Sequence, residues 1–455
     1  MDQSTPTAQM SNTNTKQSAP PATSPAPQLP SQPSSQPRDD KKLKIGLFTA
    51  VGVLFVVTII ALIIANLPWQ ETNCDTNSNA SNCNISDDTA SDSDSETPAG
   101  SGEQEMSVAL SSGSITTTIG GQSITYSGAY VVDGISVTIS NGTFTSATDD
   151  QVVFLVINGG SLKIDGNVLI DKTGSANFSG RGDSYSFYGT NSAIVVVGEG
   201  SSASINGATI TSSISGANAV VATNGSEVVI ENSEISTTKD NSRGLHATYG
   251  GSITADTVTI STQGGSSASL ATDRGAGTVI ATNMTLSTAG AGSPLIYSTG
   301  DISVTNSTGT ATGAQIAVVE GKNSITIQGC EFSTNGIGNR NNVDNAAVMI
   351  YQSMSGDASV GTGSFTALDS TLTVLSSSSI YDDVPFFFVT NTDATINLTG
   401  VTANFSNNQV FISALGTTEW GESGSNGGNV TVTLSDVTAT NTTVNIDNIS
   451  SVTGL

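Results

Sequence analysis

The fold is decided by a repeating stretch, of which residues 220–270 read VVATNGSEVVIENSEISTTKDNSRGLHATYGGSITADTVTISTQGGSSASL. Its units open on apolar residues at a constant spacing of 25: Val220, Leu245, Leu270 and Leu295. A polar turn and two short runs rich in Val, Ile and Thr follow each of them. A fixed period of 20–50 residues assembled from short alternating runs is typical of a solenoid.

The residue types within each unit predict strands. Val, Ile and Thr dominate and strong helix formers are scarce, which disfavours an α-solenoid. Each run alternates apolar and polar residues, so that one face is buried only when the next unit stacks on it. Three short strands per unit, stacked at about 4.8 Å, predict an all-β fold, a right-handed single-stranded parallel β-helix. Tandem β-sandwich modules would instead repeat at roughly 100 residues around a Trp or Cys-pair core, a pattern that is absent here.

Several positions indicate how the units stack. One inward column is predicted for Ile139, Ile164, Ile205 and Ile230. The wider gap between the second and third of these is explained by an insertion at 175–191, rich in Gly, Ser and aromatic residues. Asparagines in tight turns tolerate a left-handed backbone and can bond between units, which we expect of Asn141, Asn232 and Asn306. Cys330 is expected to pack as a small apolar residue.

The charge of the chain excludes one class of partner. The 13 Lys and Arg residues face 38 Asp and Glu residues, for a formal net charge of −25. Nucleic acid is therefore not expected as a partner, because phosphate binding requires a basic face. An acidic surface of this kind also favours solubility.

The chain before the repeats divides into three segments. Residues 1–42 hold most of the prolines among Ser, Thr and Gln, and are predicted to be a disordered cytoplasmic tail. Residues 43–67 contain an uncharged apolar run preceded by Lys41 and Lys42, which predicts a single transmembrane signal-anchor helix with the N-terminus inside the cell. Residues 68–105 carry acidic and no basic side chains, and are predicted to be an extended extracellular linker.

The remaining residues, 106–455, are predicted to form the β-helix ectodomain. The plasma membrane is thus the expected location, with one span and the C-terminal domain outside the cell. Cys74 and Cys83 lie in the linker and outside the cell could form a disulfide, with a reduced pair as the open alternative.

Five motifs carry a family resemblance: SRGLHA at 242–247, ATDRG at 271–275, IYSTGD at 296–301, VEGKN at 319–323 and YQSMSGDA at 351–358. With them, residues 130–450 resemble bacterial cell-surface proteins that carry pectate-lyase-like right-handed β-helices and are adhesin-like or uncharacterised. The resemblance implies the fold and surface display. It does not specify a chemistry, because this fold hosts lyases, hydrolases and adhesins alike.

Aligning the units on Val220, Leu245, Leu270, Leu295, Ala317 and Met349 places one polar column three residues further on: Thr223, Thr248, Asp273, Ser298, Glu320 and Gln352. Basic and aromatic side chains accompany this column. The candidate ligand-binding residues are therefore Arg243, His246, Tyr249, Asp273, Arg274, Tyr297, Glu320, Lys322, Tyr351 and Gln352.

Three functions are consistent with this column. The first is a shallow groove for a glycan or acidic polymer, in which Tyr rings stack on sugars and Arg or Lys meets carboxylates; it makes the protein a non-catalytic surface adhesin or carbohydrate binder of a host or neighbouring cell surface. The second is a surface-tethered polysaccharide lyase, with calcium on Asp273 and Glu320, or a glycoside hydrolase using the same pair. The third is a structural spacer whose column only satisfies backbone groups. No cofactor or catalytic residue is assigned under the first function.

Overall fold

The computed structural model describes residues 82–84, 107–176, 178–335, 346–353, 355–375, 385–405, 410–416, 428–440, 446–447 and 451–453. These belong to one compact unit, Glu71–Leu455. The predicted tail, the predicted span at 43–67 and Cys74 lie outside the described residues. Among the residues that are described, no helix has the length and apolar character needed to cross a membrane.

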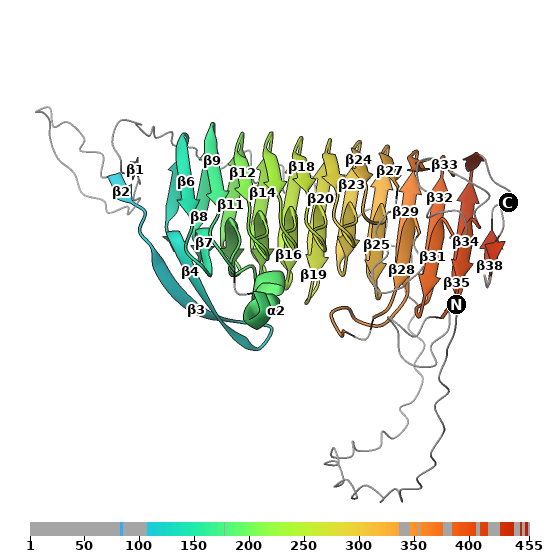
Figure 1. Ribbon diagram of the computed structural model, residues 1–455, viewed down its shortest axis with the longest axis horizontal. Coiled ribbons are helices and arrows are strands. Elements are labelled where there is room, and N and C mark those ends of the chain that lie inside the picture. The colour runs from blue at the N-terminus through green and yellow to red at the C-terminus, as the bar shows by residue number, and fades with distance from the viewer. Residues whose placement is uncertain are drawn as a thin grey trace, which may run out of the picture. The chain divides into compact units, whose positions relative to one another are not determined.

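Most of the regular structure in the described chain is strand, arranged in three long sheets (Figure 1). Sheet 1 contains, in spatial order, β3 (Gly113–Ile119), β4 (Gln122–Asp133), β7 (Gln151–Ile157), β10 (Ile194–Val197), β13 (Val220–Thr223), β16 (Leu245–Thr248), β19 (Leu270–Asp273), β22 (Ile296–Ser298), β25 (Ala317–Glu320), β28 (Val348–Tyr351), β31 (Phe387–Thr390), β34 (Ile412–Ala414) and β37 (Ile446–Asp447).

Sheet 2 contains β5 (Ser136–Ile139), β8 (Ser161–Asp165), β11 (Ser202–Asn206), β14 (Glu227–Glu231), β17 (Ser252–Asp256), β20 (Thr278–Thr282), β23 (Asp301–Thr305), β26 (Ser324–Gln328), β29 (Gly363–Leu368), β32 (Ala394–Thr399), β35 (Val430–Ser435) and β38 (Ser451–Thr453). Sheet 3 contains β6 (Gly142–Ser146), β9 (Val168–Lys172), β12 (Thr209–Ser212), β15 (Glu234–Thr237), β18 (Thr259–Thr262), β21 (Thr285–Thr288), β24 (Thr308–Ala311), β27 (Glu331–Thr334), β30 (Thr371–Val374), β33 (Thr402–Asn404) and β36 (Thr438–Thr440).

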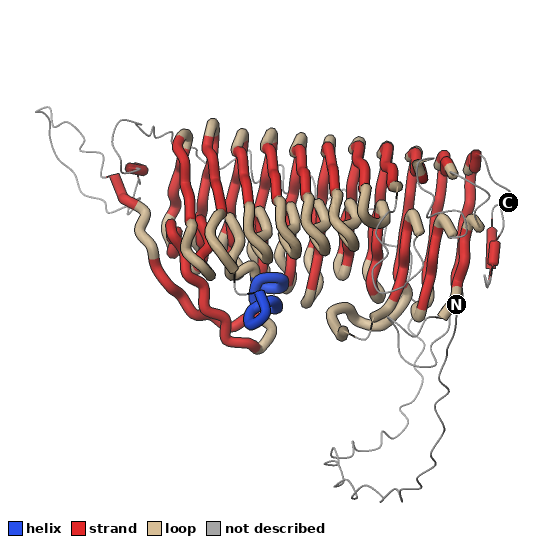
Figure 2. Tube along the Cα trace, in the orientation of Figure 1, coloured by secondary structure: helices blue, strands red, loops and turns tan. Residues whose placement is uncertain are grey.

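The order of the strands shows how the chain winds. From β4 onward each strand pairs in parallel with the strand three places later, so successive strands enter the three sheets in rotation. Figure 2 shows the consequence, a stack of strand layers joined by short turns. This is the repeated stacking of a parallel β-helix, and the predicted all-β solenoid is confirmed at this level.

Two strand pairs depart from the parallel arrangement. Strands β3 and β4 form an antiparallel hairpin, so that the solenoid begins only in the second half of β4. Strand β1 (Asn82–Asn84) pairs antiparallel with β2 (Ser107–Ala109). The first of these two short strands lies in the segment that the sequence predicts to be a linker.

The interior is filled by alternate residues of each strand. In β14 the side chains of Val228 and Ile230 are buried, whereas Val229 between them is half-buried on the outer side. The predicted isoleucine column is confirmed: Ile139 pairs with Ile164, Ile164 with Ile205, and Ile205 with Ile230. Each fully buried side chain of this kind contributes roughly 1.5–3 kcal/mol relative to an exposed one.

The turns between sheets 2 and 3 use the predicted asparagines. Asn232 and Asn306 have left-handed backbones, with φ of 48° and 49°. The side-chain amide of Asn232 donates to Oδ1 of Asn206 in the preceding coil at 2.9 Å, and that of Asn206 donates to Asp165 at 3.1 Å. Asn141 makes a different contact, a 3.5 Å bond to its neighbour Ser140.

The strands in the middle of sheet 1 are buried on both faces, which decides where a site can lie. All four residues are buried in β10, β13, β16 and β19. The outer face near the N-terminal coils is covered by an apolar cluster that includes Ile119, Tyr126 and Tyr188. Further along, a second cluster surrounds Met349 and Phe388. Between these two apolar covers the outer face of sheet 1 is polar.

The insertion at 175–191 contains the one helix of the described residues. Phe178–Tyr188 forms α2, with a break in helical geometry at Arg181. Figure 1 shows the helix beside sheet 1, next to the β3–β4 hairpin. The phenol of Tyr126 on β4 donates to the carbonyl of Tyr188 at 2.8 Å, which ties the hairpin to the helix.

The register of sheet 1 corrects the alignment derived from the sequence. Leu270 pairs with Ile296 rather than Leu295, and Ala317 pairs with Val348 rather than Met349. The first slip arises in the turn after β19, where the coil is one residue longer and Ala276 takes a left-handed backbone, φ 58°. An alignment that assumes a constant spacing of 25 residues cannot detect one extra residue in a turn. Cys330, by contrast, is buried in the main core as expected.

Candidate functional site

Most of the candidate residues lie on the outer face of sheet 1. They lie between α2 and Ser353 with residues 355–359, which are together called the segment 353–359. The pairing places Thr223 beside Thr248 and Thr248 beside Asp273, as the sequence alignment predicts. Beyond Asp273 the predicted column is right at Glu320 and wrong by one residue on either side of it. Ser298 pairs with Val319 and not with Glu320. On the other side, Tyr351 and not Gln352 pairs with Glu320.

The centre of this face is a group of three charged or ionisable side chains, Arg243, His246 and Asp273, here called the Asp273 group. Asp273 is 3% exposed and His246 is fully buried. Nη2 of Arg243 lies 3.1 Å from Oδ2 of Asp273, and Nε2 of His246 lies 3.9 Å from the same oxygen. Ala271 pairs directly with His246, and a small residue at this position leaves room for the neighbouring side chains.

Burial changes the protonation of this group. It raises the pKa of Asp273 to about 6, against the opposing effect of the Arg243 guanidinium. It lowers the pKa of His246 well below 6.5, and the nearby Arg243 lowers it further. His246 is thus a neutral imidazole at neutral pH. Neither of its ring nitrogens, nor Nη1 of Arg243, has a hydrogen-bond partner among the described residues.

Arg274 follows Asp273 and joins two parts of the cover. Its Nε donates to Asp357 of the segment 353–359, and its Nη1 lies 3.5 Å from Oδ2 of Asp183 on α2. Its guanidinium lies over the ring of Phe187, 3.7 Å from the centroid. The backbone N–H of Arg274 donates to Asp273 at 3.0 Å. One arginine therefore links α2, the segment 353–359 and the Asp273 group.

Glu320 is the second buried carboxylate, 1% exposed. It accepts hydrogen bonds from the phenols of Tyr297 and Tyr351, the latter at 2.8 Å, and from the hydroxyl of Ser353. Burial raises the pKa of both phenols well above 10, and the charge of Glu320 raises both further. These phenols remain protonated donors, and Glu320 holds the segment 353–359 against sheet 1.

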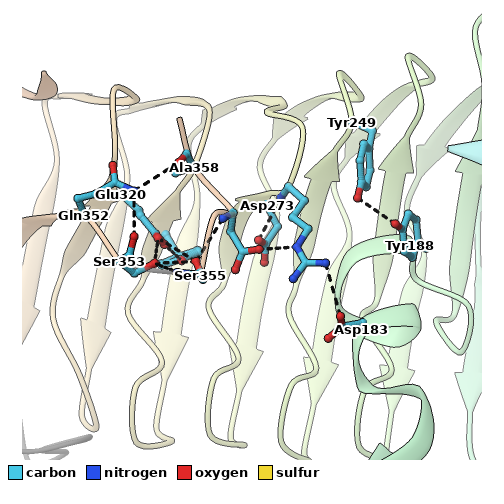
Figure 3. Close-up of polar contacts among 12 residues, drawn as sticks. Asp183, Tyr188, Tyr249, Asp273, Glu320, Gln352, Ser353, Ser355 and Ala358 are labelled. Atoms are coloured by element: carbon cyan, nitrogen blue, oxygen red, sulfur yellow. Dashed lines mark hydrogen bonds and ion pairs between the residues drawn. The ribbon is translucent and has the colours of Figure 1, made fainter. Parts of the chain in front are cut away.

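Tyr249 lies at the other end of the face, where α2 meets the coil of β16. Its ring stacks on Tyr188 with 5.2 Å between centroids and an angle of 8°, and the two phenols are 3.1 Å apart. Thr248 donates to the carbonyl of Phe187 at 2.9 Å. Figure 3 shows the contact between Tyr249 and Tyr188 and those around Glu320 across neighbouring coils.

The remaining two predicted residues are placed differently. Lys322 is exposed, and its backbone N–H bonds to the carbonyl of Ser359 at 3.0 Å. Gln352 is buried, and its amide donates to the carbonyls of Ser353 and Ala358. Gln352 therefore shapes the segment 353–359 and does not face the Asp273 group.

Alignment of the repeats misses the residues that approach from outside the repeat: Asp183, Phe187, Tyr188, Ser353, Ser355 and Asp357. Their signals in the sequence are the aromatic residues of the 175–191 insertion and the polar motif at 351–358. Neither signal specifies which coil the side chains contact. Only the structure shows that both segments meet at Arg274.

The arrangement of the carboxylates bears on whether this face can bind a metal ion. In the part of the chain that the structure describes, no three or more His, Cys, Asp or Glu side chains converge as metal ligands do. Asp273 and Glu320 instead bind donors of the protein itself. A calcium ion on this pair would have to displace those donors.

A comparison with protein families and with curated proteins found no match for this chain.

Proposed function

We propose that this protein is a membrane-anchored cell-surface protein whose right-handed parallel β-helix binds carbohydrate without catalysis. The resemblance of the sequence to surface adhesins suggests that this binding serves adhesion. The supporting observation is the composition and placement of the outer face of sheet 1. Tyr249, Arg274 and Tyr297 are each part-buried, so that each has a fixed position and an accessible edge.

Rigid aromatic rings and preformed donors suit a sugar ligand. Aromatic faces stack on the apolar faces of sugar rings, while charged groups bond to hydroxyls. The strands of sheet 1 position these side chains, because Tyr297 lies on β22 and Tyr249 and Arg274 directly follow β16 and β19, and neighbouring coils are hydrogen-bonded. A preorganised surface loses little entropy when a ligand binds.

Binding is favoured over catalysis by the state of the two carboxylates. Asp273 is paired with Arg243, and Glu320 accepts hydroxyl donors from Tyr297, Tyr351 and Ser353. Both are almost entirely buried. A glycoside hydrolase needs two carboxylates that reach opposite sides of one glycosidic bond. Two buried carboxylates that are bound to donors of the protein itself do not meet this requirement.

One observation favours the alternative, a surface-tethered polysaccharide lyase or hydrolase. Asp273 has a pKa of about 6 and lies beside the neutral His246, and such shifted values are frequent at catalytic sites. Turnover of a polysaccharide that is abolished in Asp273→Asn would establish this alternative. A third role, a spacer without any ligand, predicts no glycan binding by the chain.

The test is a glycan array probed with the full-length chain and three variants. We expect Tyr249→Ala and Tyr297→Ala to reduce binding about 5-fold or more, since stacking on an aromatic ring is worth about 1 kcal/mol. Ile280→Ala is the matched control, because Ile280 is 48% exposed on sheet 2, away from this face. Loss of binding in the control as well, or no bound glycan at all, contradicts the proposal.

A further inference from the structure

The Asp273 group is covered by two segments that are separate in the sequence. Helix α2 approaches from one side and the segment 353–359 from the other, and both contact Arg274. Beneath them His246 is fully buried although it lies on the outer face of the sheet. Arg274 therefore acts as a clasp that joins the two covers over the Asp273 group.

The contacts of the clasp are unequal in strength. Asp357 bonds directly to Nε and its side chain is 16% exposed. Asp183 lies 3.5 Å from Nη1 and its side chain is 77% exposed. Exposed ion pairs of the second kind are worth only about 0–1 kcal/mol, so the contact with α2 can be released at little cost.

The two carboxylates occupy the positions that a ligand carboxylate would take. A planar guanidinium recognises carboxylates through parallel N–H donors, and Phe187 holds the plane of Arg274. The side chain of Arg274 is 32% exposed, so a ligand can reach it from solvent. Just below it, Nη1 of Arg243 and the ring nitrogens of His246 lack partners among the described residues.

The charge of the chain limits the ligand. A net charge of −25 repels long polyanions, while the cation at Arg274 attracts a single carboxylate. We propose that Arg274 recognises an isolated glucuronate-type residue of an otherwise neutral glycan, whose carboxylate displaces Asp183 and Asp357 and so uncovers the Asp273 group. The chain's own aspartates then act as internal competitors of the ligand.

The test uses His246, the only histidine of the chain, as a reporter. Diethyl pyrocarbonate modifies accessible imidazoles, and mass spectrometry of the peptide that contains His246 gives the rate. In the full-length chain, Asp183→Asn with Asp357→Asn should raise this rate about 5-fold, the equivalent of about 1 kcal/mol of ion pairing. Asp165→Asn, which removes the surface pair with Lys163 on sheet 2, should leave the rate unchanged.

The ligand is tested with a matched pair of small glycosides. Methyl β-glucuronoside at millimolar concentration should raise the rate in the wild-type chain, and methyl β-glucoside, which lacks the carboxylate, should not. In the Arg274→Gln variant, His246 should be modified rapidly, and the glucuronoside should no longer change the rate. Equal rates in the wild-type chain and the double variant overturn the clasp. A double variant that reacts faster, with no effect of the glucuronoside, overturns the recognition of carboxylate.

This inference rests on the proposed carbohydrate-binding function, and the two fail in different ways. Bound glycans on the array together with unchanged reactivity of His246 overturn the clasp alone. An array without bound glycans overturns the carbohydrate-binding function, whatever the reactivity of His246.

Discussion

At the scale of single residues, the unusual feature is an ionisable cluster buried on the outside of a sheet. Parallel sheets are normally covered on both faces by apolar side chains, and most of sheet 1 follows this rule. The coils of β16 and β19 place His246 and Asp273 there instead. Arg243 compensates the charge of Asp273, which avoids the cost of an unpaired buried carboxylate.

The burial of His246 makes stability depend on pH. The folded pKa lies below the unfolded value of about 6.5, so the unfolded chain binds the proton first as pH falls. The contribution of His246 to the free energy of unfolding should therefore fall below about pH 6.5, by up to about 1.4 kcal/mol per pH unit. His246→Gln should remove this contribution, measured by guanidinium unfolding between about pH 8 and 5.

Asp273 contributes to the pH dependence of stability with the opposite sign, so its contribution must be separated from that of His246. Its pKa is raised from 3.8 to about 6 in the folded state, so protonation stabilises the fold as pH falls through that window. The difference between the wild-type chain and His246→Gln isolates the imidazole. The single imidazole resonance in the NMR spectrum is an independent check, and a titration near 6.5 in the folded chain would contradict its burial.

At the scale of strands, one residue per column decides the packing. Ile230 of β14 is fully buried between Ile205 and Ala255 of the neighbouring coils. Ile230→Ala should lower the free energy of unfolding by about 2–5 kcal/mol, through lost burial and the cavity that remains. Val229→Ala is the matched control on the outer face of the same strand and should cost less than about 1 kcal/mol. Equal shifts in the denaturation midpoint would mean that the two side chains do not point to opposite faces.

Helix α2 shows the limit of the strand pattern. The residues of α2 interrupt the repeat, and the spacing of their apolar side chains does not indicate a helix. Its position depends on Tyr126 and on the neighbouring residues Thr248 and Tyr249, which come from two distant parts of the chain. Contacts of this range cannot be derived from a local pattern, so the insertion was predicted and its structure was not.

At the scale of the whole molecule, the proposed surface display depends on residues 43–67, which lie outside the described residues. We expect the full-length chain to remain in the membrane fraction after alkaline extraction, because an apolar run of that length is stable in a bilayer. Deletion of residues 45–67 should release the chain into the soluble fraction. Protease added to intact cells should remove residues 106–455 from the anchored form. A deletion variant that stays with the membrane would contradict this anchor.

By itself, the sequence determined the architecture, because a repeat of Val, Ile and Thr every 25 residues can bury its apolar face only by stacking on the next unit. It also placed Arg243, His246, Asp273 and Arg274 close together, since residues one repeat apart become neighbours. Only the tertiary structure decided the register after Asp273, where the coils differ in length and the positions of Ser298 and Gln352 each depart by one residue from the predicted column. It also decided that α2 and the segment 353–359 close over the site, because such long-range contacts follow from shape and charge and leave no period in the chain.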